Sequence, residues 1–125
     1  MPHLPYSIEL HDSTLAAVER DGAAAVVKLR PAYIHRDGKG WRQDADLRVG
    51  SASAEIGVST LPAKLADGRI KNEGGPYHNL LELPLKVFGP VVVTLELFSE
   101  EVVRIEGVDA EVVVYGKPEY VEDVA

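Results

Sequence analysis

Apolar and polar side chains alternate along most of this chain with a period of two residues rather than the 3.6 residues of a helix. The alternation predicts strands over residues 14–20, 23–36, 41–49, 54–58, 91–98, 102–106 and 110–115, and residues 80–86 form a further short apolar run. Turn residues separate these segments. The pattern indicates an all-β fold, an antiparallel β-sandwich or open barrel of seven or eight strands with little or no helix.

Turn chemistry places several of the boundaries. Asp21-Gly22 predicts a two-residue type I′ hairpin turn, and residues 37–40 predict the next turn. Pro31 predicts a bend in the second strand, because proline cannot donate to a ladder. Residues 59–79 are the least regular part, where Leu61, Leu65 and Ile70 could anchor a loop or a short strand, while residues 107–109 predict a turn and residues 116–125 form an acidic tail.

One parity of the predicted strands is consistently apolar, and these residues are the predicted core. They are Leu15, Val27, Leu29, Leu47, Val91, Val93, Leu95 and Leu97. With 125 residues, of which 46% are hydrophobic and 26% charged, the chain is expected to form a single domain over residues 1–125.

Composition narrows the possible functions. The absence of cysteine excludes disulfides and thiol catalysis. The net charge of −7 disfavours nucleic acid as a partner, since its binding depends on phosphate neutralisation. No apolar run approaches about 18 residues, and no secretion signal is recognised, so we expect a cytoplasmic protein without a membrane partner.

The charge is uneven along the sequence. Residues 96–125 hold nine acidic and two basic side chains, whereas residues 20–48 hold seven basic and four acidic ones. The two segments could form ordinary cross-strand ion pairs, or they could meet between neighbouring subunits.

The sequence contains no GxSxG, HExxH, Walker A or GxGxxG motif. His11-Asp12-Ser13 has the residue types of a general base or metal site, but neighbours on an extended chain point to opposite faces. The alternative is a local turn in which Asp12 and Ser13 bind their own backbone. We therefore assign no catalytic residue, no metal site and no cofactor.

Two aromatic and imidazole-bearing segments form the candidate ligand site. Aromatic faces, imidazoles and an amide together favour a polar small molecule. The alternative is that Tyr33 and Trp41 cap the end of the core. The six candidate residues are Tyr33, His35, Trp41, Tyr77, His78 and Asn79.

Short motifs along most of the chain resemble a family of small uncharacterised bacterial proteins. They are the His11-Asp12-Ser13 opening, Pro31-Ala32-Tyr33-Ile34-His35-Arg36, Tyr77-His78-Asn79-Leu80 and the closing Gly116-Lys117-Pro118-Glu119-Tyr120-Val121-Glu122. The resemblance implies a β-rich bacterial domain and transfers no activity. Lys117 stands where the family pattern has an acidic residue.

Several functions remain open at this point. The main hypothesis is a non-enzymatic binding or interaction module, with a protein partner or a second copy of the chain, since an open sheet leaves an edge to cover. The alternative is an enzyme or metal-dependent protein that uses His11, Asp12, His35 and His78. A further alternative is an immunity-type protein that neutralises a toxin through its acidic surface.

Overall fold

The computed structural model describes residues 6–58 and 60–124, and its regular structure is almost entirely strand. The all-β fold predicted from the sequence is confirmed. The described residues form ten strands and one 3₁₀ turn. These elements are β1 (Ser7–Glu9), η1 (Leu10–Asp12), β2 (Thr14–Asp21), β3 (Ala24–Arg36), β4 (Lys39–Gly50), β5 (Ser53–Ile56), β6 (Ala63–Asn72), β7 (Gly75–His78), β8 (Leu80–Glu82), β9 (Lys86–Leu97) and β10 (Val102–Asp123).

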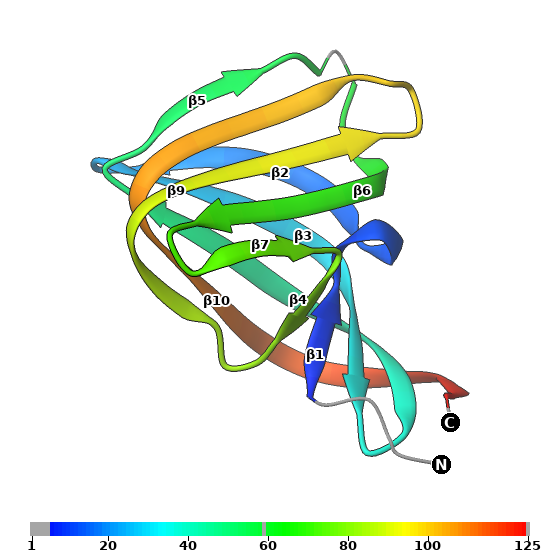
Figure 1. The fold of residues 1–125 in the computed structure, drawn as a ribbon. Coiled ribbons are helices and arrows are strands. Elements are labelled where there is room, and N and C mark those ends of the chain that lie inside the picture. The colour runs from blue at the N-terminus through cyan, green and yellow to red at the C-terminus, as the bar shows by residue number, and fades with distance from the viewer. Residues whose placement is uncertain (1–5, 59, 125) are drawn as a thin grey trace.

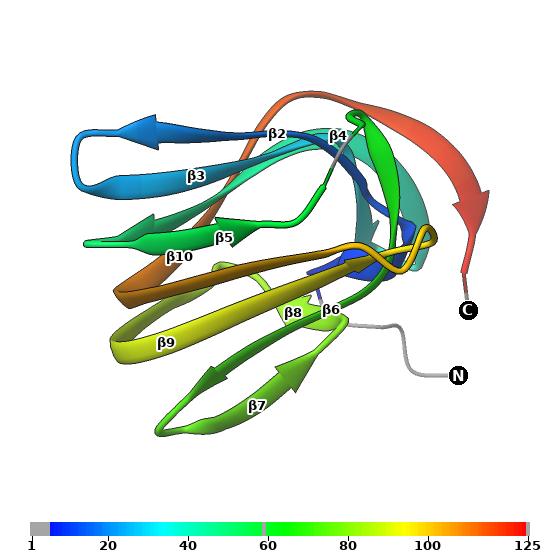
Figure 2. The same ribbon diagram turned by 90° about the horizontal axis from the view of Figure 1, so that it is seen from above.

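Six strands pair in a ring, with β2, β6, β9, β10, β4 and β3 following one another and β3 returning to β2. All the pairings are antiparallel. The ladder between β2 and β6 has only two residue pairs, Thr14 with Lys64 and Leu15 with Ala63. The ring is therefore an open barrel, with β2 and β3 on one side and β9 and β6 on the other (Figure 2).

The same ten-stranded sheet continues beyond one end of this barrel, and we call this extension the smaller sheet. The outer half of the β3–β4 hairpin lies between the end of β10 on one side and β1 on the other, and β8 pairs with β1 (Figure 1). In this sheet Tyr33 lies between Glu9 and Arg42, and His35 lies between Ser7 and Gly40. Residues far apart in the sequence thus meet at this end.

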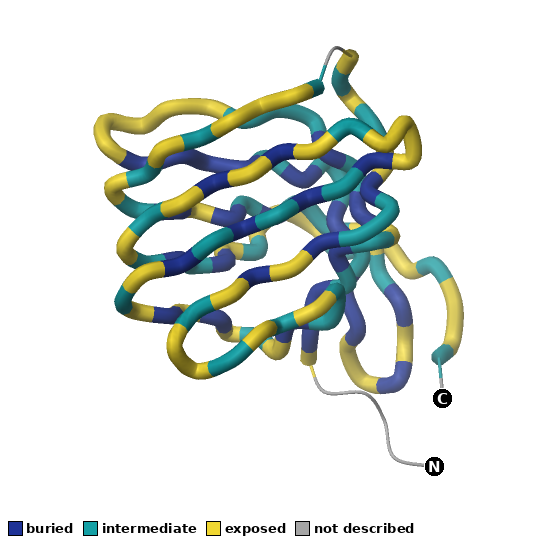
Figure 3. The backbone as a smooth tube through the Cα atoms, turned by 45° about the horizontal axis from the view of Figure 1, so that its top comes forward, coloured by how far each residue is buried: buried dark blue, intermediate teal, exposed yellow. Residues whose placement is uncertain are grey.

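The barrel interior is apolar. Buried and exposed positions alternate along the barrel strands, as the period of two requires (Figure 3). All eight residues of the predicted core are buried, none with more than 3% of its surface exposed. The parity analysis of the sequence therefore identified the core correctly.

The hairpin turns differ in part from the prediction. The first turn is Gly22-Ala23, because Asp21 already pairs with Ala24, and Gly22 has a positive φ of 61°. The next turn, Asp37-Gly38, has φ values of 54° and 72°, as a type I′ turn requires. At Pro31 the register of β3 against β4 shifts, as the prediction of a bend there implied.

Two predicted irregular regions are strands. Residues 59–79 contain the β6–β7 hairpin, in which Ile70 pairs with Tyr77. The expected turn at residues 107–109 is a bulge within the continuous β10, and the acidic tail continues that strand to Asp123. The acidic tail runs beside β4 of the same chain, where Glu119 lies opposite Arg42 and Asp123 opposite Lys39 in the ladder.

No helix among the described residues is long and apolar enough to cross a membrane.

Candidate functional site

A buried serine shapes the segment between β1 and β2. The Ser13 hydroxyl donates to the Glu9 carbonyl oxygen at 2.8 Å and accepts the Tyr33 backbone N–H at 3.0 Å. Leu10 N–H donates to the Asn79 carbonyl oxygen at 2.8 Å. These bonds hold the 3₁₀ turn η1 against β3 and against the segment that follows β7.

The turn brings three ionisable side chains together. The Nε2 atom of His11 lies 3.6 Å from Glu9 Oε1 and 3.5 Å from Asp12 Oδ2. The sequence analysis discounted His11 and Asp12 because neighbours on an extended chain point apart. That interpretation was wrong, since residues 10–12 form a 3₁₀ turn rather than a strand.

The fourth member of the cluster comes from β3. His35 is only 4% exposed, and its Nε2 atom lies 3.5 Å from the second carboxylate oxygen of Glu9. Neither ring nitrogen of His35 makes a hydrogen bond. The Tyr33 ring packs edge to face against the His35 imidazole, with the ring centroids 5.1 Å apart. We call Glu9, His11, Asp12 and His35 the carboxylate–imidazole cluster.

Glu9 is the centre of this cluster. Burial of its carboxylate raises its pKa, and its hydrogen bond with Asp12 adds to the increase, while His11 and His35 oppose it. Two neighbouring carboxylates cannot both ionise freely without a compensating cation. In this cluster the two carboxylates, Glu9 and Asp12, have the imidazoles of His11 and His35 as their ionisable neighbours.

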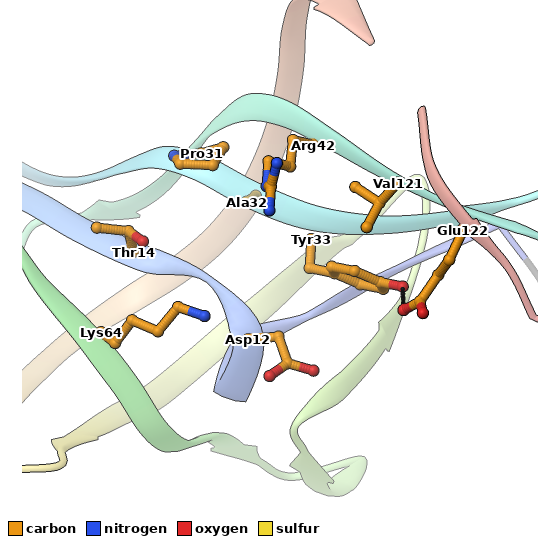
Figure 4. Close-up of a pocket in the computed structure, with 9 residues that line it drawn as sticks. All are labelled: Asp12, Thr14, Pro31, Ala32, Tyr33, Arg42, Lys64, Val121 and Glu122. Atoms are coloured by element: carbon orange, nitrogen blue, oxygen red, sulfur yellow. Dashed lines mark hydrogen bonds between the residues drawn. The ribbon is translucent and has the colours of Figure 1, made fainter. Parts of the chain in front are cut away.

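A polar cavity of about 280 Å³ lies beside the cluster, between η1, β3, β4, β6 and the end of β10 (Figure 4). Its lining residues are Asp12, Thr14, Pro31, Ala32, Tyr33, Arg42, Lys64, Val121 and Glu122. Tyr33 donates its hydroxyl proton to Glu122 at 2.6 Å. Partial burial, and then this bond to a carboxylate, raise the pKa of Tyr33 well above its usual range. Gly40 leaves room for that hydroxyl, because a Cβ at this position would collide with it.

Two cations face this cavity without a carboxylate partner. In Figure 4 the Arg42 and Lys64 side chains both point into the space between the strands. In the described part of the chain, neither side chain makes an ion pair or a hydrogen bond, although Glu119 lies opposite Arg42 in the β4–β10 ladder. The cavity therefore holds two cations without an ion pair to any described residue, Arg42 and Lys64, and two carboxylates, Asp12 and Glu122, of which Glu122 accepts the Tyr33 hydroxyl.

The other predicted site residues do not line this cavity. Trp41 lies opposite Ile34 in the ladder, on the other face of the sheet from Tyr33. Its ring packs against the Tyr120 ring, with the centroids 5.7 Å apart. Its Nε1 atom donates to the Arg36 carbonyl oxygen at 3.2 Å.

Residues 77–79, at the end of β7, stabilise their own hairpin. Tyr77 is half-buried against the core. His78 binds Asp67 at 2.6 Å, and the Asn79 side chain accepts the Gly68 N–H at 2.9 Å. Asn79 has a positive φ of 59°, a conformation that asparagine tolerates. Of the six candidate residues, the structure thus brings together only Tyr33 and His35.

Sequence analysis missed four residues of this region: Glu9, Arg42, Lys64 and Glu122. Glu9 stands two residues before His11, a spacing that could have indicated a local cluster. The other three carry no local signal, because only the sheet register and the barrel closure bring their strands together.

Comparison with known proteins finds no matching family model, no matching curated protein and no matching solved structure.

Proposed function

We propose that this protein is a non-enzymatic binding module whose cavity takes a small polar molecule with an oxyanion group, a carboxylate or a phosphate. The observation that carries the proposal is the pair of free cations, Arg42 and Lys64, directed into one polar cavity. Charged donors bind carboxylate and phosphate oxygens more strongly than neutral donors do.

The rest of the lining is consistent with a small ligand of mixed character. Pro31 and Val121 offer apolar surface, while Thr14 and Glu122 offer hydrogen-bonding groups. The volume of about 280 Å³ is at the lower end of the range for small-molecule sites. Such a cavity fits a metabolite-sized molecule rather than a macromolecule.

The electrostatics of Tyr33 support binding rather than catalysis. A tyrosine that acts as a base or nucleophile must lose its proton. Partial burial and the bond to Glu122 raise the pKa of Tyr33, so the neutral hydroxyl is favoured. Tyr33 is thus suited to fix Glu122 and to line the cavity.

The test is an NMR titration of backbone amides with inorganic phosphate and, separately, with acetate, against sodium chloride of equal ionic strength. We expect saturating shifts at Thr14 and Ala32 with at least one of the two oxyanions, and the tighter of the two identifies the ligand class. Lys64→Gln and Arg42→Gln should each weaken binding by about tenfold or more, because each removes a charged hydrogen-bond donor.

The matched control is Lys71→Gln. Lys71 is an exposed lysine on the same strand as Lys64, seven positions further along, and it makes no ion pair with the described residues. It lies about 23 Å away at the rise of an extended strand. The proposal fails if neither oxyanion gives saturation, or if Lys71→Gln weakens binding as much as Lys64→Gln.

We also propose that two copies of the chain associate. β8 ends the order of paired strands and pairs only with β1 among the described strands, and Phe88 and Phe98 are each 71% exposed. An unpaired edge and exposed aromatic rings are typical of association surfaces. Light scattering at rising protein concentration tests this proposal, and a constant monomer mass overturns it. The bacterial family, the cytoplasmic location and the immunity-type alternative stay predictions.

A further inference from the structure

Asp12 belongs to both the cavity and the carboxylate–imidazole cluster, whereas Glu9, His11 and His35 do not line the cavity, so oxyanion binding there does not explain them. We propose that Glu9, His11 and Asp12 bind a divalent first-row transition-metal ion, and that His35 positions Glu9 by donating to its second carboxylate oxygen. This metal site is separate from the proposed oxyanion site, and the sequence analysis had assigned no metal site.

The geometry of the three ligands fits one ion. The two distances from His11 Nε2, 3.6 Å to Glu9 Oε1 and 3.5 Å to Asp12 Oδ2, bring all three side chains around one point. One ligand atom from each of Glu9, His11 and Asp12 lies within 4.8 Å of the others. Ligand bonds of 2.0–2.2 Å in a tetrahedral site place neighbouring ligand atoms roughly 3.3 to 3.6 Å apart. Only small side-chain movements would therefore complete the site.

His35 gives an independent indication of a ligand. It is the buried member of the cluster, with 5% of its side chain exposed, and neither ring nitrogen makes a hydrogen bond. A buried polar group without a partner is costly and is usually retained for a reason. With Glu9 Oε1 on a metal ion, the other oxygen would accept the N–H of His35. Groups that orient a ligating carboxylate in this way are a regular part of metal sites.

The donor set indicates the class of ion. Two carboxylates and one imidazole, without thiolate, are ligands for zinc, cobalt or manganese rather than for copper(I) or iron–sulfur clusters. A charge of +2 would neutralise two ionised carboxylates. Three protein ligands also leave a coordination position open, and Asp12 faces the cavity as well as the cluster.

The test is a titration of the metal-free protein with Co²⁺, read from its visible absorption, followed by competition with Zn²⁺. We expect one equivalent to bind, with Zn²⁺ displacing Co²⁺. His11→Gln and Asp12→Asn remove ligands at exposed or half-exposed positions, so both variants should fold. Each should weaken binding by more than the ~10 to 100-fold typical of losing an outer group.

His35 is tested as a positioning residue by two variants. His35→Gln keeps an amide donor beside Glu9, whereas His35→Leu fills the space without a donor. We expect the leucine variant to lose about tenfold or more in affinity, and the glutamine variant to lose less, with the cobalt spectrum preserved in both. A purely structural role would change the stability of the fold and leave the two affinities equal, which would overturn the assignment of His35.

The control variant is His78→Gln. His78 is also an exposed imidazole beside a carboxylate, Asp67, and should make no difference to binding. His3→Gln tests the remaining histidine, which lies outside the described residues. The proposal is overturned if no stoichiometric binding occurs, or if either control loses as much affinity as His11→Gln. Oxyanion binding depends on Lys64, so Lys64→Gln separates a failure of the cavity from a failure of the metal site.

Discussion

Strand β3 passes from the barrel into the smaller sheet, and its buried residues change in character along the way. In the barrel half, Val27 and Leu29 point into an apolar core. Beyond the register shift at Pro31, the same strand buries His35. The buried polar residues of the described chain are Ser7, Ser13 and His35, and all three lie at this end, on β1, on β3 or at the turn between β1 and β2.

The difference shows two ways of holding a β-structure together. Removal of apolar area from water stabilises the barrel interior, and this requires side chains of complementary shape but few directional contacts. At the site end, buried polar groups need specific partners, and an incomplete set is costly. Of the three buried polar residues in the described chain, His35 has ring nitrogens without a hydrogen bond, and this cost to stability supports the proposal that the polar end binds a ligand.

The largest effect on the free energy of unfolding is expected from truncation of a side chain in the barrel core. Leu95 is fully buried on β9, so Leu95→Ala should lower the free energy of unfolding by about 2–5 kcal/mol through lost transfer energy and a cavity. Urea denaturation measures the change. The control Val113→Ala, at a position that is 45% exposed, should stay within about 0.5 kcal/mol. Equal stability of the two variants would show that Leu95 does not pack in the core.

A smaller effect on the free energy of unfolding is expected from a substitution at the polar end of the molecule. Ser13→Ala leaves the Glu9 carbonyl and the Tyr33 N–H without their partner, which costs about 1–3 kcal/mol. The same variant should loosen η1 and therefore weaken binding at the cavity, an effect that Leu95→Ala would not have while the protein remains folded. Ser53→Ala on the exposed β5 is the control. If Ser13→Ala is neutral in both measurements, Ser13 does not organise this end.

The barrel could be predicted from the sequence because its physics is local and periodic. Parity along 91–98 depends only on neighbouring residues, and it identified Val93 and Leu95 correctly. For the segment of β6 the sequence left a loop or a short strand open, because Ala63, Ala66 and Gly68 blur the alternation. The continuous course of β10 was missed because Gly107 predicts a turn, whereas the sheet accommodates it as a bulge.

The site could be predicted only in part. Tyr33 and His35 were recognised by their chemical type, an aromatic ring and an imidazole at the end of a predicted strand. The grouping of His11 with Asp12 depends on a 3₁₀ turn that Ser13 fixes through long-range hydrogen bonds. Lys64 and Glu122 reach the cavity only through strand pairings between distant segments, and no local pattern encodes such pairings.

The smallest effect on stability is expected from the ion pair between His78 and Asp67, on the β6–β7 hairpin, whose strand β6 packs against η1. Partial burial of Asp67 opposes its ionisation, but hydrogen bonds from His78 and Asn79, with the charges of His78 and Arg69, outweigh it and hold the Asp67 pKa below its ordinary value. The unfolded chain has the higher pKa, near 3.9, so the stabilisation is complete above about pH 5 and is lost as the pH falls through the lowered pKa. Because His78 is largely exposed, the contribution is expected to be a few tenths of a kcal/mol. Asp67→Asn should therefore flatten the loss of stability between about pH 5 and pH 3 in urea denaturation, whereas Asp37→Asn, whose side chain is 85% exposed, should leave the profile unchanged. Parallel profiles for the wild type and Asp67→Asn would show that the His78–Asp67 pair adds nothing to the stability of the barrel.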